Sequence, residues 1–363
     1  METDAGQGVL TVDLDAVVAN WRDLSARHGA PCAGVLKADG YGLGAAPVGR
    51  ALHAAGCQTF FVAHLAEGVA LRAALGTSPA IIVLNGFAPG ADAGAGLWPV
   101  LNSLGDVAAH AAAGRADGAP RPALLHLDTG MSRLGLDARE QAALAADRAR
   151  LAGLDLRFVM THLACADDPA HPLNARQAQR FAAAAAAIAP GVKRSFANSS
   201  GIFLGPDYAS DLARPGCALY GINPTPGAPN PMRQVAVLEV PVLQLRDIAP
   251  GDTVGYGAGY TAPRNVRVAT VAAGYADGYL RCLSGRSLAL FQGRAVPLIG
   301  RVSMDLTTFD ATDFPELRPG SRLMLVGGPG NTPDDIAARC GTIGYEVLTS
   351  LGDRYQRQTI GGV

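Results

Sequence analysis

The sequence lacks the short cysteine and histidine patterns that mark metal and disulfide sites. Its six cysteines are scattered singly, without a Cys-x-x-Cys or Cys-x-x-His pair, so we expect neither a metal site nor a disulfide framework. It also lacks a dominant charge, because 30 Lys and Arg residues stand against 31 Asp and Glu residues. A balanced chain has no overall field that would recruit nucleic acid, so a small-molecule partner is expected instead.

Long hydrophobic runs are absent too. The longest apolar stretch, residues 181–189, is alanine-rich and far shorter than the ~20 residues that span a bilayer. We therefore expect a helix there and no membrane partner. The opening residues METDAGQGVLTVDL contain neither the basic nor the apolar region of a secretory signal, which predicts a cytoplasmic protein.

Short apolar runs alternate with amphipathic patterns such as residues 65–75 and 138–151. Eight runs are candidate strands: AGVLK (33–37), TFFVA (59–63), AIIVL (80–84), WPVLN (98–102), ALLHLD (123–128), LRFVMTH (156–162), RSFANS (194–199) and CALYG (217–221). Eight β/α units of this size predict an α/β fold with an N-terminal (β/α)8 TIM-type barrel, because continuous apolar strands line a buried parallel sheet. A doubly wound sheet is the alternative.

The texture changes at NPTPGAPNPM (223–232), where proline recurs too often for a helix or a central strand. We predict a barrel over residues 10–225 and a mostly β C-terminal domain over 226–363, with residues 1–9 packing on the second domain. The predicted strands of that domain lie in VAVLEVPVLQL (235–245), RVATVAAGY (267–275), SLALFQ (287–292), AVPLIG (295–300), LTTFDAT (306–312) and RLMLVGG (322–328).

Polar residues follow several candidate barrel strands. They are Lys37, the segment 128–133, His162, Asn198 with Ser199, and Arg214 with Gly216. The carboxyl ends of barrel strands face the loops that carry active sites, so this placement indicates a functional site. Taken alone, His162 fits a hydrogen-bonded core histidine better, and Arg214 a surface arginine before a loop proline.

Lys37 ends an apolar strand, where burying an unpaired lysine is costly. Its position fits either a lysine that reaches solvent or a desolvated lysine with a lowered pKa, which carbonyl chemistry requires. The following residues ADGYGLGA favour the second interpretation. Glycines 40, 42 and 44 permit a close backbone approach to a ligand, and Tyr41 can donate a hydrogen bond to a phosphate.

At VLKADGYGLG (35–44) the sequence resembles the alanine racemases, fold-type III enzymes that use pyridoxal phosphate. Further segments resemble family motifs in the same order: HLDTGMSRLG (126–135), THLACADD (161–168), FANSSG (196–201), RPGCALYG (214–221), VGYGAGYTA (254–262), GYADGY (274–279), GRVSMD (300–305) and IGYE (343–346). The resemblance covers nearly the whole chain.

The resemblance implies a two-base reaction. Lys37 holds pyridoxal phosphate covalently and acts as acid/base on one face of the substrate α-carbon, and Tyr256 serves the other face. Racemisation needs both groups, because one removes the α-proton while the other delivers a proton from the opposite side. In this family the site is completed across a homodimer, with Tyr256 and Met304 contributed by the partner subunit. Taken alone, Tyr256 fits a glycine-flanked turn residue better than a catalytic one.

The resemblance also implies how the cofactor is held. Arg214 hydrogen-bonds the pyridine nitrogen, and His162 packs against the ring. Related decarboxylases place a carboxylate where Arg214 stands, so this residue favours racemase chemistry. The phosphate is bound by Tyr41, Ser199, Tyr345 and the backbone N–H groups of Gly216 and Cys217, with Asn198 beside it.

The substrate carboxylate is assigned by resemblance to Arg133 and the backbone N–H of Met304. Tyr345, Tyr275 and Met304 narrow the site and its entrance to little more than a methyl side chain, and Asp305 belongs to the same lining. Alanine is therefore the expected substrate.

Three positions depart from the family pattern. His126 stands where many relatives carry a lysine whose carbamate orients the substrate-binding arginine, and it could instead accept a hydrogen bond from Arg133 or leave room for an anion. Ser195 replaces a histidine that supports the pyridine-side arginine in some relatives, and Ser303 replaces a frequent cysteine. The residues that position the two arginines are therefore not determined by the resemblance, while the residues assigned to the chemistry match the family pattern.

The implied function is the interconversion of L-alanine and D-alanine, which supplies D-alanine for peptidoglycan or degrades it. A broad-specificity or serine racemase is one alternative. A non-catalytic pyridoxal phosphate carrier is another, although such single-barrel proteins lack a second β domain and any counterpart of Tyr256.

Overall fold

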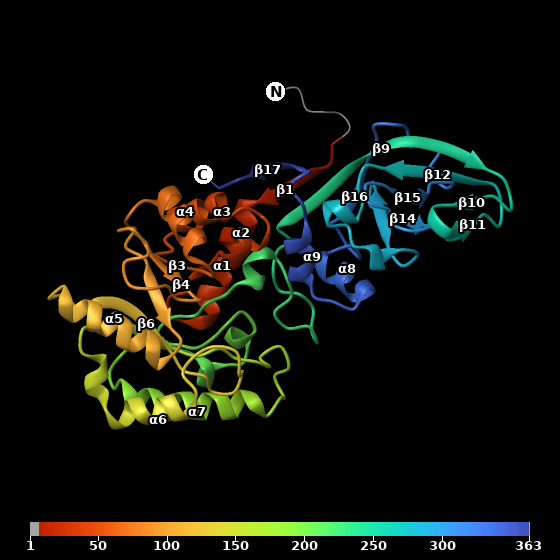
Figure 1. The fold of residues 1–363 in the computed structure, drawn as a ribbon. Helices are drawn as coiled ribbons and strands as arrows, with labels where there is room; N and C mark the ends of the chain where they lie inside the picture. Colours follow the sequence, from red (N-terminus) through yellow and green to blue (C-terminus); the bar gives the residue numbers. More distant parts are fainter. Residues whose placement is uncertain (1–6, 363) are drawn as a thin grey trace. The chain divides into compact units, whose positions relative to one another are not determined.

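The computed structural model describes residues 7–362, which form two compact units. One unit spans Val17–Arg233, and the other combines residues 7–16 with Gln234–Gly361 (Figure 1). The unit boundaries lie at 16/17 and 233/234, whereas the sequence-based division placed them at 9/10 and 225/226. The strand β1 (Val9–Asp13) accounts for the first difference, because it pairs with strands of the second unit.

The first unit is built on a parallel sheet of seven strands that pair in chain order. They are β2 (Gly34–Val35), β3 (Thr59–Val62), β4 (Ala80–Val83), β5 (Trp98–Leu101), β6 (Arg121–His126), β7 (Leu154–Met160) and β8 (Arg194–Ser195). Bridges from Ala213 to Cys32 and from Leu212 to Ser195 join the two edges of this sheet. The predicted α/β barrel class is confirmed, with seven strands and a bridging segment.

The predicted eighth strand at CALYG is wrong. Cys217–Tyr220 form a short 3-10 helix, η4, which ends at Gly221 with a left-handed φ of 83°. Leu212 and Ala213 already occupy the ladder positions beside β8 and β2. Tyr220 is buried and donates a hydrogen bond from its hydroxyl to the carbonyl of Val35, which fixes η4 against the start of the barrel.

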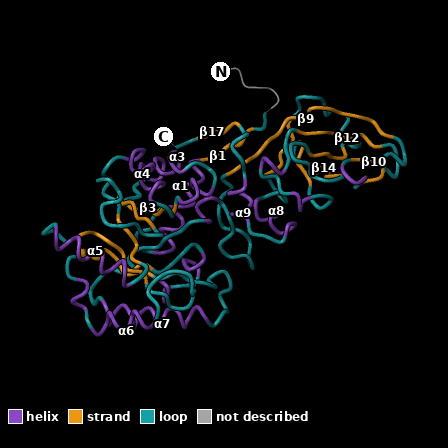
Figure 2. Tube along the Cα trace, viewed as in Figure 1, coloured by secondary structure: helices purple, strands orange, loops and turns teal. Residues whose placement is uncertain are grey.

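Helices connect the barrel strands. They are α1 (Leu14–His28), α3 (Ala45–Ala54), α4 (Leu65–Leu75), α5 (Leu104–Ala116), α6 (Ala138–Ala146) and α7 (Leu173–Ile188). The alanine-rich α7 lies beside α6 (Figure 2). It buries Phe181, Ala185 and Ile188, which follow each other at helical spacing on one face. No helix between residues 7 and 362 is long and apolar enough to cross a bilayer.

The second unit is a mainly antiparallel β structure around the long strand β9 (Ala236–Ile248). This strand pairs with β16 (Arg322–Val326) along one part and with β12 (Val266–Val271) along another. The sheet runs from β12 through β15 (Thr307–Asp310), β14 (Arg294–Ile299) and β13 (Leu288–Phe291) to β16, so β9 closes it into a ring. The predicted mostly β character is confirmed.

The rest of the second unit frames this ring. The strand β17 (Gln356–Ile360) runs parallel to β1, and the short hairpin β10 (Thr253–Val254) with β11 (Tyr260–Thr261) stands apart from the main sheet. Two helices, α8 (Pro333–Cys340) and α9 (Gly344–Ser350), were not predicted. Their signal was present at the start of α8, where Thr332 caps the helix and Pro333 follows at its first position.

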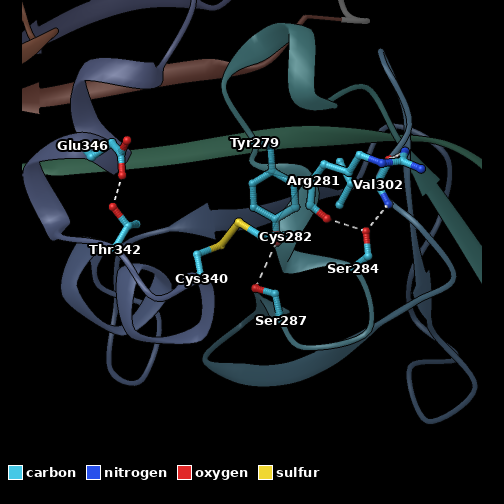
Figure 3. The surroundings of a disulfide bond; sticks show 9 residues. All are labelled: Tyr279, Arg281, Cys282, Ser284, Ser287, Val302, Cys340, Thr342 and Glu346. Carbon is cyan, nitrogen blue, oxygen red and sulfur yellow. Dashed lines mark hydrogen bonds between the residues drawn. A yellow bond between two sulfur atoms is a disulfide. The ribbon is translucent and has the colours of Figure 1, made fainter.

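The expectation of no disulfide framework is also wrong. Cys282, in the 3-10 helix η7 (Arg281–Leu283), and Cys340, the last residue of α8, form a disulfide with their Cα atoms 5.4 Å apart (Figure 3). The two cysteines are 58 residues apart in the sequence and belong to no spacing motif. Only the fold brings them together. The other four cysteines are free thiols.

We predict that Cys282→Ser lowers the free energy of unfolding by about 4 kcal/mol, because the crosslink restricts the unfolded chain. Thermal melts with and without dithiothreitol measure this effect. The wild-type protein should melt lower with reductant, while Cys282→Ser should melt low in both. Cys165→Ser, which removes a free thiol, is the matched control. Six titratable thiols in the untreated unfolded protein would contradict the crosslink.

Candidate functional site

Lys37 begins a left-handed turn directly after β2. In this turn, α2 (Lys37–Tyr41), the φ angles of Ala38, Asp39 and Tyr41 lie between 51° and 56°. Left-handed conformations cost non-glycine residues roughly 1–2 kcal/mol each, and such strain concentrates at functional sites. The turn therefore needs support from its surroundings, and it fixes where the lysine leaves the strand.

Glu67 supplies much of that support. Its carboxylate accepts a hydrogen bond from the backbone N–H of Ala38 at 2.6 Å, and from those of Ala63 and His64 at 2.8 and 2.9 Å. Glu67 thus ties the Lys37 turn to the start of α4. Our sequence analysis missed this residue, although a glutamate at the third position of a helix is a known capping signal.

Burial lowers the pKa of Lys37, and the positive charge of Arg133 lowers it further against the opposing effects of Glu67 and Cys217. The lysine is half-buried at the end of the barrel strand. A lowered pKa increases the fraction of neutral amine at physiological pH, and the neutral amine is the nucleophilic form. The site therefore makes Lys37 more reactive than a surface lysine.

Arg214 is buried, with 4% of its surface exposed. Its guanidinium donates to the hydroxyl of Ser195 at 2.6 Å and to the carbonyl of Thr161 at 2.5 Å. Burial lowers its pKa to about 10, so the group stays charged at neutral pH. No Asp or Glu within residues 7–362 forms a salt bridge with it. A buried cation without an anionic partner is unusual and indicates a ligand site.

Ser195 stands at the position for which the sequence did not determine how Arg214 is held. Besides accepting from the guanidinium, its hydroxyl donates to the carbonyl of Leu212 at 2.8 Å. Arg214 therefore has a neutral hydroxyl as its partner at this position. His162 lies on the other side, with its Nδ1 at 3.5 Å from Nη2 of Arg214. Burial, followed by the charge of Arg214, holds the pKa of His162 well below its usual value, so the ring is neutral.

Ser199, Gly216 and Tyr41 meet where η4 begins. The hydroxyl oxygen of Ser199 accepts hydrogen bonds from the backbone N–H groups of Gly216 at 3.0 Å and Ala218 at 3.3 Å. A Cβ atom on Gly216 would lie 2.2 Å from the Tyr41 hydroxyl, so any larger residue there would displace the Tyr41 side chain. Tyr41 stacks on Tyr220 with ring centroids 4.7 Å apart. Hydroxyl and backbone donors converge here, as phosphate binding requires.

Asn198 is ordered by its own neighbours. Its side-chain oxygen accepts from the N–H of Gly201 at 2.9 Å and its amide donates to the carbonyl of Leu163 at 3.4 Å. These bonds hold the segment that leads into Ser199. These bonds indicate that Asn198 has a structural role next to Ser199 and Gly216.

The loop that carries Arg133 is shaped by Asp128. Its carboxylate accepts hydrogen bonds from the N–H groups of Gly130, Met131 and Ser132, and these bonds outweigh burial to hold its pKa below the usual value. The side chain of Arg133 is exposed. Its charge still affects the pKa values of Lys37 and His162, so the three groups lie near one another.

His126 pairs with a residue that the sequence analysis did not consider. Its Nδ1 lies 2.8 Å from Oδ1 of Asn102, which makes Nδ1 the donor and leaves Nε2 as an acceptor. Burial, with the charge of Arg214 next, lowers the pKa of His126 to about 4. The ring is therefore neutral at physiological pH, whereas a carbamate at this place would be an anion.

The other predicted residues lie in the second unit. Tyr256 opens the 3-10 helix η5 (Tyr256–Ala258) at the tip of the β10–β11 hairpin, and 69% of its surface is exposed. Met304 is 53% exposed, and Tyr275, in η6 (Tyr275–Asp277), and Tyr345, in α9, are also exposed. Asp305 forms a salt bridge with Arg354, which the sequence analysis did not single out.

The donor set of the first unit fits a planar, phosphorylated aldehyde. It combines an amine of lowered pKa, a buried arginine without a carboxylate partner and a cluster of hydroxyl and backbone donors. An amine can attack a carbonyl, an arginine can only donate to a ring nitrogen, and the cluster suits a phosphate. Pyridoxal phosphate has these three features.

Comparison with known proteins gives a consistent result. Residues 12–224 match the model of the alanine racemase N-terminal domain, and residues 235–359 match that of the alanine racemase C-terminal domain. The alanine racemase of Acidiphilium cryptum is 55% identical over 351 residues, covering 96% of this chain and 97% of that protein. A catabolic alanine racemase of Mesorhizobium japonicum is 50% identical, covering 99% and 94%.

Solved structures agree with these matches. A crystal structure of alanine racemase from Bartonella henselae with covalently bound pyridoxal phosphate superimposes with a TM-score of 0.93 at 39% identity, covering 98% of this chain and 99% of that one. Biosynthetic alanine racemase from Pseudomonas aeruginosa gives a TM-score of 0.87 at 35% identity, with 98% and 99% covered. Both domains and nearly the full length are matched, and the chain belongs to the alanine racemase family.

Proposed function

We propose that this chain racemises alanine with two acid/base groups, Lys37 and Tyr256, on opposite faces of the substrate α-carbon. Alanine racemisation is the activity of the relatives that match it over nearly their whole length. The observation that carries the proposal is the buried Arg214, which has a neutral hydroxyl and a carbonyl as its partners. A carboxylate at this place would favour a different chemistry.

The cofactor is pyridoxal phosphate. When bound, it supplies an electron sink that makes the α-proton of alanine acidic. Arg214 would donate a hydrogen bond to the pyridine nitrogen while keeping its own proton at neutral pH, so the nitrogen would stay unprotonated and the sink would be weaker. This contact would limit side reactions such as transamination. His162 would pack against the ring.

Lys37 would hold the cofactor through its amine and exchange a proton with one face of the α-carbon. Tyr41, Ser199, Tyr345 and the backbone N–H groups of Gly216 and Cys217 would hold the phosphate, with Asn198 beside them. The contact between Gly216 and Tyr41 supports this assignment, because it draws two of the donors together.

Substrate recognition depends on both units. Arg133 and the backbone N–H of Met304 bind the carboxylate of alanine. Tyr275, Tyr345, Met304 and Asp305 line the approach and restrict the side chain to about a methyl group. Tyr256 exchanges a proton with the face opposite Lys37.

The site is completed in a homodimer, in which Tyr256 and Met304 reach the site of the partner subunit. Exposed apolar side chains on the second unit support this assembly: Tyr256, Met304, Leu306, Ile343 and Tyr345. The enzyme works in the cytoplasm, supplying D-alanine for peptidoglycan or degrading it, and relatives of both kinds match the chain.

The cofactor lysine can be identified directly, because the chain contains only Lys37 and Lys193. We predict that borohydride reduction of the purified enzyme labels Lys37 alone, as read by peptide mass spectrometry. Lys37→Ala should lose the near-visible absorbance band and at least about 10³-fold in turnover. The exposed Lys193 is the control, and Lys193→Ala should keep both properties. Label on Lys193 would refute the assignment.

For Tyr256→Phe we predict a loss of about 10²–10⁴-fold in racemisation, because the proton donor of one face is removed. Cofactor absorbance should not change. Tyr260→Phe, in the same hairpin, is the matched control and should keep full activity. Polarimetry from L-alanine and from D-alanine measures both directions, and full turnover of Tyr256→Phe in both would disprove the two-base assignment.

Tyr345→Ala should enlarge the side-chain space and admit serine. We expect the ratio of kcat/KM for L-serine over L-alanine to rise about tenfold, the size of effect that a small steric change gives. Assays with a panel of L-amino acids measure it. An unchanged panel would remove Tyr345 from the entrance.

A further inference from the structure

One arginine bridges two carboxylates in the second unit. Nε of Arg354 donates to Oδ1 of Asp277 at 2.6 Å, and its Nη1 donates to Oδ1 of Asp305 at 2.8 Å. The three residues belong to different segments of the chain. Hydrogen bonds to both carboxylates raise the pKa of Arg354 above its usual value, so the bridge remains charged at every physiological pH.

Asp277 organises the turn that carries Tyr275. It is buried, its Oδ2 accepts from the N–H of Gly274 at 2.9 Å, and its carbonyl accepts from the N–H of Gly352 at 3.0 Å. The same carboxylate therefore faces the turn with one oxygen and Arg354 with the other. Any displacement of Asp277 would be transmitted to Tyr275, two residues earlier.

The segment that carries Met304 packs on this turn. The N–H of Tyr275 donates to the carbonyl of Ser303 at 2.9 Å, and the N–H of Ala276 donates to that of Met304 at 3.0 Å. A Cβ atom on Gly274 would lie 2.3 Å from the Met304 carbonyl oxygen. The two backbones thus touch, and Asp305 follows directly with its carboxylate on Arg354.

The end of α9 completes the cluster. A Cβ atom on Gly278 would lie 2.0 Å from the carbonyl oxygen of Ser350, the last residue of the helix that carries Tyr345. Arg354 comes four residues after that helix ends. The guanidinium of Arg354 therefore joins the segments that carry Tyr275 and Met304, and the end of the helix that carries Tyr345 packs on the first of them.

We propose that Arg354 is a positioning residue for the substrate entrance, holding the Tyr275 turn, the Met304 segment and the end of α9 in register. This inference rests on the proposed place of Tyr275, Met304 and Tyr345 at that entrance. Arginine suits the task, because its planar fork presents two donors at once to two carboxylates that would otherwise repel each other.

The exposure of the Arg354 side chain distinguishes a positioning role from a contribution to the stability of the whole protein. The side chains of Arg354 and Asp305 are 53% and 57% exposed, and an ion pair between exposed groups adds little to the free energy of unfolding. The buried Asp277 keeps a second partner, because its Oδ2 accepts from the N–H of Gly274. Removing the guanidinium leaves the carboxylates of Asp277 and Asp305 without their shared partner. The consequence is local, in the geometry of two adjacent turns.

A matched control lies in the same unit. Arg264 forms a 3.1 Å salt bridge with Asp310, and the side-chain exposures of that pair, 50% and 13%, are close to the 53% and 7% of Arg354 and Asp277. Arg264 precedes β12, and Asp310 ends β15. Arg264→Ala thus removes a comparable ion pair without touching the Tyr275 or Met304 segments.

The test compares Arg354→Ala, Arg354→Lys and Arg264→Ala as full-length enzymes. For Arg354→Ala we expect KM for L-alanine to rise about tenfold, with kcat changing by less than about threefold, because a misplaced positioning group weakens productive binding. The ratio of kcat/KM for L-serine over L-alanine should rise. Arg354→Lys, which keeps one charged donor, should recover part of the loss. Arg264→Ala should resemble the wild type.

Hydrogen exchange gives a readout that is independent of activity. The amides of Tyr275 and Ala276 should exchange faster in Arg354→Ala and not in Arg264→Ala, with melting temperatures equal between the two variants. Unchanged KM, serine preference and exchange in Arg354→Ala would overturn the proposal.

Measuring Tyr345→Ala in parallel separates two failures. If Tyr345→Ala alters specificity and Arg354→Ala does not, the positioning role fails while the proposed entrance stands. If neither variant alters specificity, the entrance itself is misplaced and the inference falls with it.

Discussion

The structure depends on withdrawing two cationic groups of the first unit from water, with Lys37 half-buried and Arg214 buried, while no Asp or Glu among residues 7–362 forms a salt bridge with either. Lys37 sits on a strained left-handed turn, and Arg214 donates to a hydroxyl and a carbonyl. Burial lowers the pKa of both groups. The same desolvation has different effects on the two, because an amine of lowered pKa becomes a nucleophile whereas a guanidinium remains a charged donor. The pKa values of His126 and His162 are lowered as well, so both rings are neutral and add no further positive charge.

The supporting contacts explain how this strain is tolerated. Glu67 binds three backbone N–H groups around the Lys37 turn, and Ser195 links Arg214 to Leu212 in the segment that joins the two edges of the sheet. Support for the cofactor side of the site thus comes from the parallel sheet itself. In the second unit, the turn that carries Tyr275 is held by Asp277, whose carboxylate also pairs with Arg354.

The sequence predicted the parts of the fold that have periodic patterns. Buried strands such as β3 and β4 and the helix α4 lie at the residues expected, because continuous apolar runs and helical spacing report burial directly. The strand predicted at CALYG (217–221) was wrong, because an apolar run also fits a buried 3-10 helix. The disulfide between Cys282 and Cys340 left no local signal, since it joins residues 58 positions apart.

The candidate site, like the fold, could be predicted from the sequence only where the signal is local. Lys37 and its glycines could be singled out from local chemistry, and the remaining roles came from resemblance. Glu67, Asn102 and Arg354 were not found, because each acts through a contact between segments that are distant in sequence. Residues that carry the chemistry can be recognised in a single sequence more readily than the residues that position them.

The central claim, that two separate groups serve the two faces of the α-carbon, is tested most directly by isotope exchange. L-alanine carrying protium at the α-carbon is converted in D₂O, and the D-alanine formed at low conversion is analysed by mass spectrometry. Two bases predict that nearly all product carries deuterium from solvent, because the proton removed on one side is not the one delivered on the other. Product that retains most of the original protium would show that a single group carries the proton across, and would contradict the account.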